Sequence, residues 1–179
     1  MNSMKKSALF LCLLFSISSS AKVHREHSAH QHGAGTLGIA FENLQGKIDF
    51  KIPSDSIIGF EFTPKSEKDK KIKAAQLSLL ENSIAEIVQF SKDIGCKITK
   101  EKIEAIKDEA ESKELHAEHS DVVAVFSVNC LKSPLGSKIV FNFQKYFPRI
   151  SDVDVQVIVG DLQKSVEAKK VATELDLSK

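Results

Sequence analysis

Histidine is the residue type in this chain whose number and spacing could do chemistry. The six histidines form two clusters, one near the N-terminus and one in the second half of the chain: His24, His27, His30 and His32, and then His116 and His119. Neutral imidazole is a common ligand for zinc and copper, and a carboxylate can complete a tetrahedral zinc site. Because histidine-rich polar tracts are typical of metal-binding segments, we expect this chain to bind a metal.

Both clusters contain the pattern H-x-E-H, so that an acidic residue stands among the histidines. The best candidate ligands are His27, His30, His32, His116 and His119, with Glu26 and Glu118 as candidate carboxylate ligands and His24 as a further histidine. The two clusters could converge on one metal ion, with an N-terminal arm closing over a metal held by the second cluster. The alternative is that both clusters are solvated polar segments that bind nothing.

Catalytic motifs are a second kind of chemistry to consider. Zinc proteases use H-E-x-x-H on a helix, where two histidines one turn apart share a face, and neither cluster has that spacing. The sequence also lacks G-x-S-x-G and a glycine-rich phosphate loop. We therefore expect a binding protein without catalytic residues or an organic cofactor, and not an enzyme.

The N-terminus has the pattern of a secretory signal. Lys5 and Lys6 precede an apolar run over residues 8–17, and small residues follow up to Ala21. This order predicts a signal peptide that is cleaved after Ala21, since the run is shorter than the ~20 residues that a membrane span requires. Cleavage leaves 158 residues and changes the net charge from +1 to −1, so nothing indicates nucleic-acid binding. No second apolar run reaches spanning length, so a protein that is not embedded in the membrane is expected.

Cleavage at this position would create a second candidate metal site. The new N-terminus would read Lys22-Val23-His24, which offers an amine, two amides and an imidazole. Such a set can surround a square-planar metal, the geometry that suits Cu²⁺ or Ni²⁺.

Two cysteines, Cys96 and Cys130, remain after cleavage. In an oxidising compartment, such a pair predicts a disulfide. The alternative is a pair of metal thiolates, although thiolates survive poorly outside the cytosol and the chain has no C-x-x-C pair.

Apolar periodicity predicts the elements that must position these residues. Alternation predicts strands over residues 36–41, 46–52, 96–99, 122–130, 139–143 and 153–159, and a last strand over 171–177. Helical spacing predicts a pair of helices around residues 63–92, with Thr63-Pro64 at the start and a break at Asn82-Ser83.

This order of elements predicts an α+β fold with a mostly antiparallel β-sheet, for which a sandwich-like packing is one form, and an inserted helical pair. We expect a signal peptide over residues 1–21, a flexible His-rich arm over 22–35 and a single domain over 36–179. A charged loop is expected at about residues 107–120.

Several segments spread over nearly all of the mature chain also match those of a known family. They are E-H-S-A-H-Q-H-G-A-G-T-L at residues 26–37, I-I-G-F-E at 57–61, P-K at 64–65, F-S-V-N-C at 126–130, Y-F-P at 146–148 and V-D-V-Q-V-I at 153–158. Together they resemble the ZrgA-like family of periplasmic zinc-uptake proteins. The resemblance implies zinc binding in the Gram-negative periplasm, a membrane zinc transporter as partner, and a disulfide between the paired cysteines.

The chain departs from the family pattern at two places. Family members often carry a long loop rich in His and Asp before the strand that ends in the second cysteine, and here only residues 115–119 represent it. Family members also often have a histidine after the segment that ends in Glu61, where this chain has Phe62. Both changes remove candidate ligands.

The sequence thus predicts a periplasmic metal-binding protein that binds zinc for a zinc import system. The alternative is an envelope protein that binds a protein partner or an anion and no metal.

Overall fold

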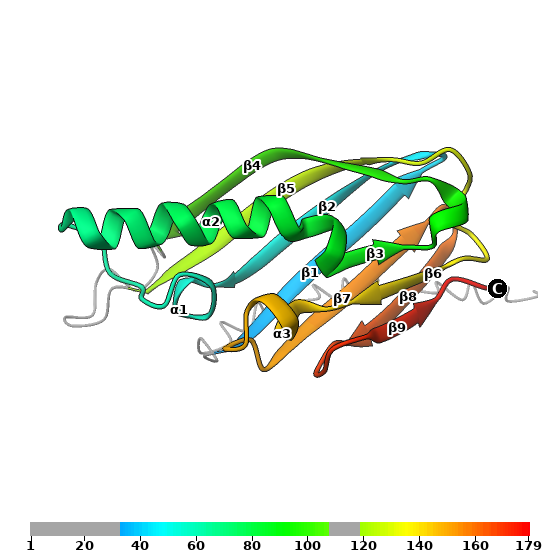
Figure 1. Ribbon diagram of the computed structural model, residues 1–179. Coiled ribbons are helices and arrows are strands. Elements are labelled where there is room, and N and C mark those ends of the chain that lie inside the picture. The colour runs from blue at the N-terminus through cyan, green and yellow to red at the C-terminus, as the bar shows by residue number, and fades with distance from the viewer. Residues whose placement is uncertain (1–32, 108–118) are drawn as a thin grey trace, which may run out of the picture.

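The computed structural model describes residues 33–107 and 119–179, whose strands form two sheets (Figure 1). The larger sheet has the strand order β4-β5-β2-β1-β7-β8 and the smaller one the order β3-β6-β9. The strands are β1 (Ala34–Glu42), β2 (Gln45–Pro53), β3 (Val88–Phe90), β4 (Lys97–Lys107), β5 (Ser120–Asn129), β6 (Lys138–Phe141), β7 (Asp152–Val159), β8 (Leu162–Glu167) and β9 (Thr173–Asp176). The predicted antiparallel character is confirmed for the described strands, except that β1 pairs with β7 in parallel.

The helices are α1 (Ser54–Ile57), α2 (Glu67–Ile87) and α3 (Phe143–Tyr146), with a 3₁₀ turn, η1 (Lys92–Ile94), before β4. The predicted helix start at Thr63-Pro64 is three residues early. Ser66 is the N-cap residue, and its hydroxyl accepts a hydrogen bond from the backbone N–H of Asp69 at 3.1 Å. A serine in this role satisfies a backbone donor that the first helical turn leaves unpaired.

The predicted break of the helix at Asn82-Ser83 is wrong, because α2 continues through both residues. The Asn82 side chain donates to Ser78 Oγ one turn earlier, and Ser83 is buried. Asn and Ser cost a helix only several tenths of a kcal/mol each. Burial of Leu80, Ile84 and Ile87 on one face outweighs that cost.

One hydrophobic core lies between the large sheet and the elements that cover its inner face. Alternate residues of the central strands are fully buried there, among them Ile48, Phe50 and Ile52 of β2. The Phe50 ring stacks on Phe143 of α3 at a centroid distance of 5.9 Å. Phe41 of β1 meets Phe90 of β3 edge to face at 5.7 Å, which joins the two sheets. The alternation in the sequence therefore identified the buried face correctly.

Cys96 and Cys130 form a disulfide with an S–S distance of 2.01 Å, as predicted. The two residues flank a paired row of the sheet, since Lys97 at the start of β4 lies opposite Asn129 at the end of β5. The bond therefore fastens an edge strand to its neighbour, and the alternative of two metal thiolates is ruled out for this pair.

Several elements differ from the prediction because charged residues occur within strands. β4 continues to Lys107, and β8 has no counterpart among the predicted strands. Both are edge strands of the large sheet, where exposed charges are common because they discourage pairing with other chains. In β8, Lys164 even lies on the half-buried face, so the expected apolar alternation is interrupted.

The connections also differ in detail. β1 begins at Ala34, two residues before the predicted strand and inside the predicted arm. Residues 54–57, between the predicted second strand and the predicted helical pair, form α1, and Phe143 belongs to α3 and not to the preceding strand. The predicted last strand is confirmed as β9. None of the helices in the described ranges is long and apolar enough to cross a membrane.

Candidate metal site

Two strands that follow the histidine clusters begin at the same end of the large sheet. β1 and β5 both pair antiparallel with β2, which lies between them, so β1 and β5 run in the same direction (Figure 1). Neighbouring strands are about 4.8 Å apart, which separates the starts of β1 and β5 by roughly 10 Å. The segment that leads into Gly33 and the segment that leads into His119 therefore join the fold at one end.

His119 is held at this end by a glutamate from a distant part of the sequence. Its Nδ1 lies 2.6 Å from Oε2 of Glu61, and the two side chains are only 23% and 13% exposed. Next to it, the hydroxyl of Ser120 donates to the main-chain oxygen of Glu61 at 2.8 Å. Two adjacent residues at the start of β5 are thus fixed to one residue of the connection between α1 and α2.

The local sequence explains why Glu61 reaches this position. After β2 ends at Pro53, Ile57 and Ile58 are buried in the core and anchor the chain. Gly59 then has a φ of 100°, a conformation that glycine adopts easily. A Cβ at Gly59 would approach Nη1 of Arg149 to 2.5 Å, so the end of that flexible side chain would have to shift to admit one. The turn at Gly59 directs the following residues toward the start of β5.

Phe62 occupies the position where the resemblance leads us to expect a histidine. Its ring stacks on that of Phe60 at a centroid distance of 4.5 Å, and its side chain is half exposed. A phenyl ring cannot ligate a metal. In this connection, it is the neighbouring residue, Glu61, whose side chain contacts the start of β5.

The Glu61–His119 contact has the chemistry of a metal-site component. An ionised carboxylate only accepts hydrogen bonds, so Nδ1 of His119 must donate to it. A neutral imidazole that donates from Nδ1 carries its lone pair on Nε2, the atom that can ligate a metal. A histidine ligand whose other nitrogen is held by a carboxylate is a recurrent arrangement in zinc proteins.

Among the described residues, no group of three or more His, Cys, Asp and Glu residues could hold a metal ion. The nearby Asp121 is buried, and its carboxylate pairs with Nζ of Lys51 at 3.0 Å. Because zinc usually takes four ligands, His119 and Glu61 can supply only part of a site.

Of the predicted ligands, His119 is the one that falls within the described ranges. The others lie in residues 1–32 and 108–118, outside those ranges: His24, Glu26, His27, His30, His32, His116 and Glu118. The predicted Cu²⁺ or Ni²⁺ site at Lys22-Val23-His24 is outside them as well.

Glu61 is a candidate site residue that the sequence analysis does not identify. The segment that ends in Glu61 contributes to the family resemblance, but nothing in the sequence marks its carboxylate as a functional group. The two partners are 58 residues apart, and no periodicity links them. Only the topology, which brings the connection after β2 to the start of β5, reveals the pair.

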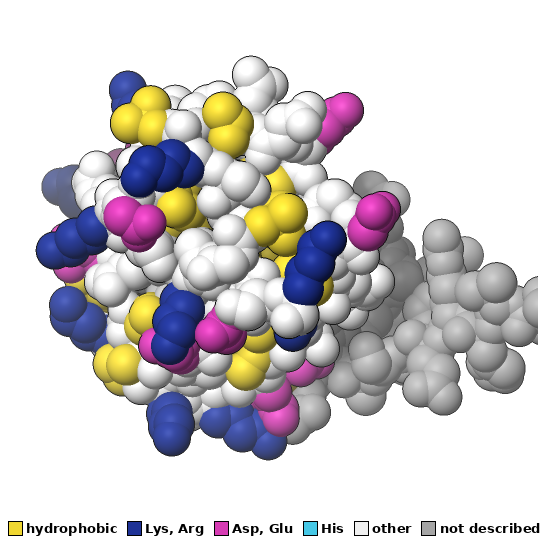
Figure 2. Space-filling model, turned by 90° about the vertical axis from the view of Figure 1, so that its right-hand side faces the viewer, with side chains coloured by type: hydrophobic (Ala, Val, Ile, Leu, Met, Phe, Trp, Pro, Cys, Tyr) yellow, Lys and Arg dark blue, Asp and Glu magenta, His cyan; other side chains and the backbone are white. Residues whose placement is uncertain are grey.

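The end of the molecule away from the starts of β1 and β5 carries a mixed surface and a groove. There, charged side chains of both signs are interspersed with hydrophobic ones (Figure 2). A groove of about 750 Å³ lies beside β3, and its lining includes Ser91, Cys96, Lys138 and Glu174.

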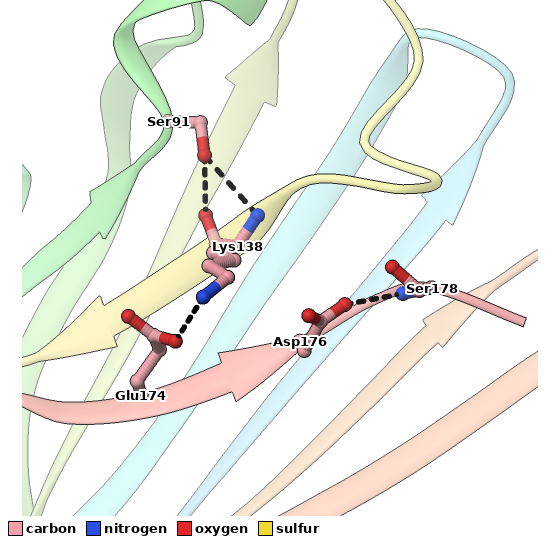
Figure 3. Close-up of polar contacts among 5 residues, drawn as sticks. All are labelled: Ser91, Lys138, Glu174, Asp176 and Ser178. Atoms are coloured by element: carbon pink, nitrogen blue, oxygen red, sulfur yellow. Dashed lines mark hydrogen bonds and ion pairs between the residues drawn. The ribbon is translucent and has the colours of Figure 1, made fainter.

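Polar contacts hold the rim of this groove (Figure 3). The ammonium of Lys138 donates to Glu174 at 2.5 Å, which raises the pKa of Lys138 above its ordinary value. The Lys138 backbone exchanges hydrogen bonds with the Ser91 hydroxyl. These contacts link β6 to its neighbours and leave no cluster of metal ligands among the described residues there.

Comparison with known proteins agrees with the resemblance. No curated protein matches the chain. The model of a family described as "ZrgA family zinc uptake protein" matches residues 29–177. That range includes both cysteines, the described pair Glu61 and His119, and the sequence from His30 through His116. With most of its length matched, the chain belongs to the ZrgA family of zinc uptake proteins.

Proposed function

We propose that this protein binds zinc in the periplasm and supplies it to a zinc import system. The observation that carries the proposal is the Glu61–His119 contact at the end of the sheet where both histidine-bearing segments join the fold. Membership of a zinc uptake family supports zinc as the cargo.

The proposed ligands come from both clusters. They are His27, His30, His32, His116 and His119, with Glu26 and Glu118 as carboxylate ligands and His24 as a further histidine. Four of these donors would complete a tetrahedral site. The roughly 10 Å between the starts of β1 and β5 supports the idea that both segments serve one site, because a few residues on each side can cover that distance.

The proposed role is binding and delivery, without catalysis. A zinc ion held by histidine and carboxylate can be released to a membrane zinc transporter, the proposed partner. The export pattern of residues 1–21 supports the periplasmic location, and the disulfide is of the kind that persists in that oxidising compartment.

A second metal site is proposed at the mature N-terminus. Lys22-Val23-His24 would take Cu²⁺ or Ni²⁺ if cleavage falls after Ala21. The mass of the secreted chain tests this directly, because a mature protein that starts at any other residue removes the site.

Calorimetric titration of the mature protein with zinc tests the main proposal. We expect saturable binding, weakened in His119→Gln by at least the roughly 10–100-fold that loss of a supporting contact costs. Joint replacement of His27, His30 and His32 by Gln should weaken binding as well. The absence of binding heat in the unaltered protein would favour the alternative of an envelope protein that binds a protein partner or an anion.

A further inference from the structure

The contact of Glu61 with His119 suggests a role for a residue outside the predicted ligand set. Glu61 is bound to the start of β5 twice, through its side chain to His119 and through its main-chain oxygen to Ser120. Both Glu61 and His119 are largely shielded from water, and Ser120 is buried. A hydrogen bond to a charged group is stronger when it is shielded in this way.

We infer that Glu61 is a positioning residue for zinc, whose carboxylate holds the His119 ring in the tautomer and orientation in which Nε2 receives the metal. The inference rests on the proposed function, because it assigns Glu61 a task at the same site. Oε2 of Glu61 lies 2.6 Å from Nδ1 of His119. The carboxylate thus contacts one ring nitrogen, and the other, Nε2, is the proposed zinc ligand.

The geometry of the connection favours this role over an incidental contact. The main-chain bond from Ser120 fixes the Glu61 backbone independently of its side chain. The buried Ile58 anchors the chain a few residues before it. The carboxylate is therefore presented from backbone that is itself bonded to the start of β5, which is what a residue that orients a ligand requires.

The ring tautomer of His119 in the metal-free protein is the first test. At about pH 7.5, above the ordinary imidazole pKa of about 6.5, the ring ¹⁵N shifts should show hydrogen on Nδ1 and the lone pair on Nε2. Glu61→Ala should return the ring to a mixture of tautomers, whereas the matched control Glu42→Ala, at the other end of β1, should change nothing. A mixture already present in the unaltered protein would overturn the inference without any reference to zinc.

Zinc affinity, measured by competition with a chelator, is the second test. Glu61→Ala should lower affinity by about 10–100-fold, the usual cost of losing such a partner. The zinc affinity of Glu61→Gln should lie between those of the unaltered protein and Glu61→Ala, since the amide oxygen of glutamine can still accept a hydrogen bond from Nδ1. Circular dichroism of each metal-free variant confirms that it is folded, and the main-chain bond from Ser120 remains available in all of them.

The double variant separates positioning from direct ligation. If Glu61 acts through His119, then Glu61→Ala adds nothing in the background of His119→Gln. A further loss of affinity in that background would show that Glu61 ligates zinc itself and would overturn the inference. If the unaltered protein and Glu42→Ala both fail to bind zinc, the proposed function fails and the zinc-positioning role fails with it, while the tautomer measurement still decides whether Glu61 sets the ring of His119.

Discussion

Among the single residues, imidazole side chains are the principal proposed zinc ligands. His119 is partly shielded, and its Nδ1 is bonded to Glu61, which leaves Nε2 as the proposed ligating atom. Asp121, a buried acid two residues after His119, is paired with Lys51 instead. Glu61 and Asp121 thus have different partners, and we propose a zinc-related role for Glu61 alone.

Zinc binding should weaken as the pH falls through about 6.5, the ordinary pKa of histidine. A proton and a zinc ion compete for the same imidazole lone pair, so the loss of affinity at low pH and the release of protons on binding have one cause. Titrations at about pH 5, pH 6 and pH 7.5 measure this directly. Equal affinity at the lowest and highest of these values would count against histidine ligation.

Among the secondary-structure elements, α2 presents one face to the core and buries side chains fully only in its second half, whereas Ile72 and Leu77 in its first half pack against the core while partly buried. The first buried residue of the helix is Leu80, and the adjacent Leu79 is 36% exposed. Ile84 and Ile87 continue the buried face. The end of the helix that leads into β3 therefore contributes most of its packing energy.

Two leucine substitutions test this arrangement. Leu80→Ala should lower the free energy of unfolding by about 2–5 kcal/mol, because it removes a fully buried side chain and leaves a cavity. Leu79→Ala makes the same chemical change at an exposed position and should cost less than about 1 kcal/mol. Urea denaturation measures both, and equal losses would show that the helix is rotated or unpacked.

The disulfide between β4 and β5 should contribute to the stability of the fold. Cys96 and Cys130 are 34 residues apart in sequence, and closing a loop of that length stabilises by roughly 4 kcal/mol in the loop-entropy treatment. The double variant Cys96→Ser, Cys130→Ser should lose about that much stability in urea denaturation. A reducing agent should lower the stability of the unaltered protein and leave that of the double variant unchanged. Equal stability of the unaltered protein with and without the reducing agent would show that the bond does not stabilise the fold.

Elements with regular alternation could be predicted from the sequence, whereas contacts between distant segments could not. Ile48, Phe50 and Ile52 alternate with charged residues, and β2 follows that pattern. β8 was missed because Lys164 stands on its half-buried face, and the helix break at Asn82 was wrong because burial of Leu80 and Ile84 outweighs a weak local preference. The Glu61–His119 pair arises from strand order, which local periodicity does not encode.

In the molecule as a whole, the two ends of the large sheet carry different features. The disulfide fastens β4 to β5 at one end, and the histidine-bearing segments join the fold at the other. The covalent link therefore stabilises the sheet without involving the proposed ligands. Because the cysteines are paired, histidine and carboxylate remain as the proposed donors for zinc.

The mass of the secreted protein under native conditions, with zinc added at neutral pH, is the decisive measurement for zinc binding. We expect a chain of residues 22–179 that has lost two hydrogens to the disulfide and retains bound zinc, with zinc retention reduced in His119→Gln. A secreted chain with the disulfide intact that retains no zinc at neutral pH would refute the proposal that this protein binds zinc.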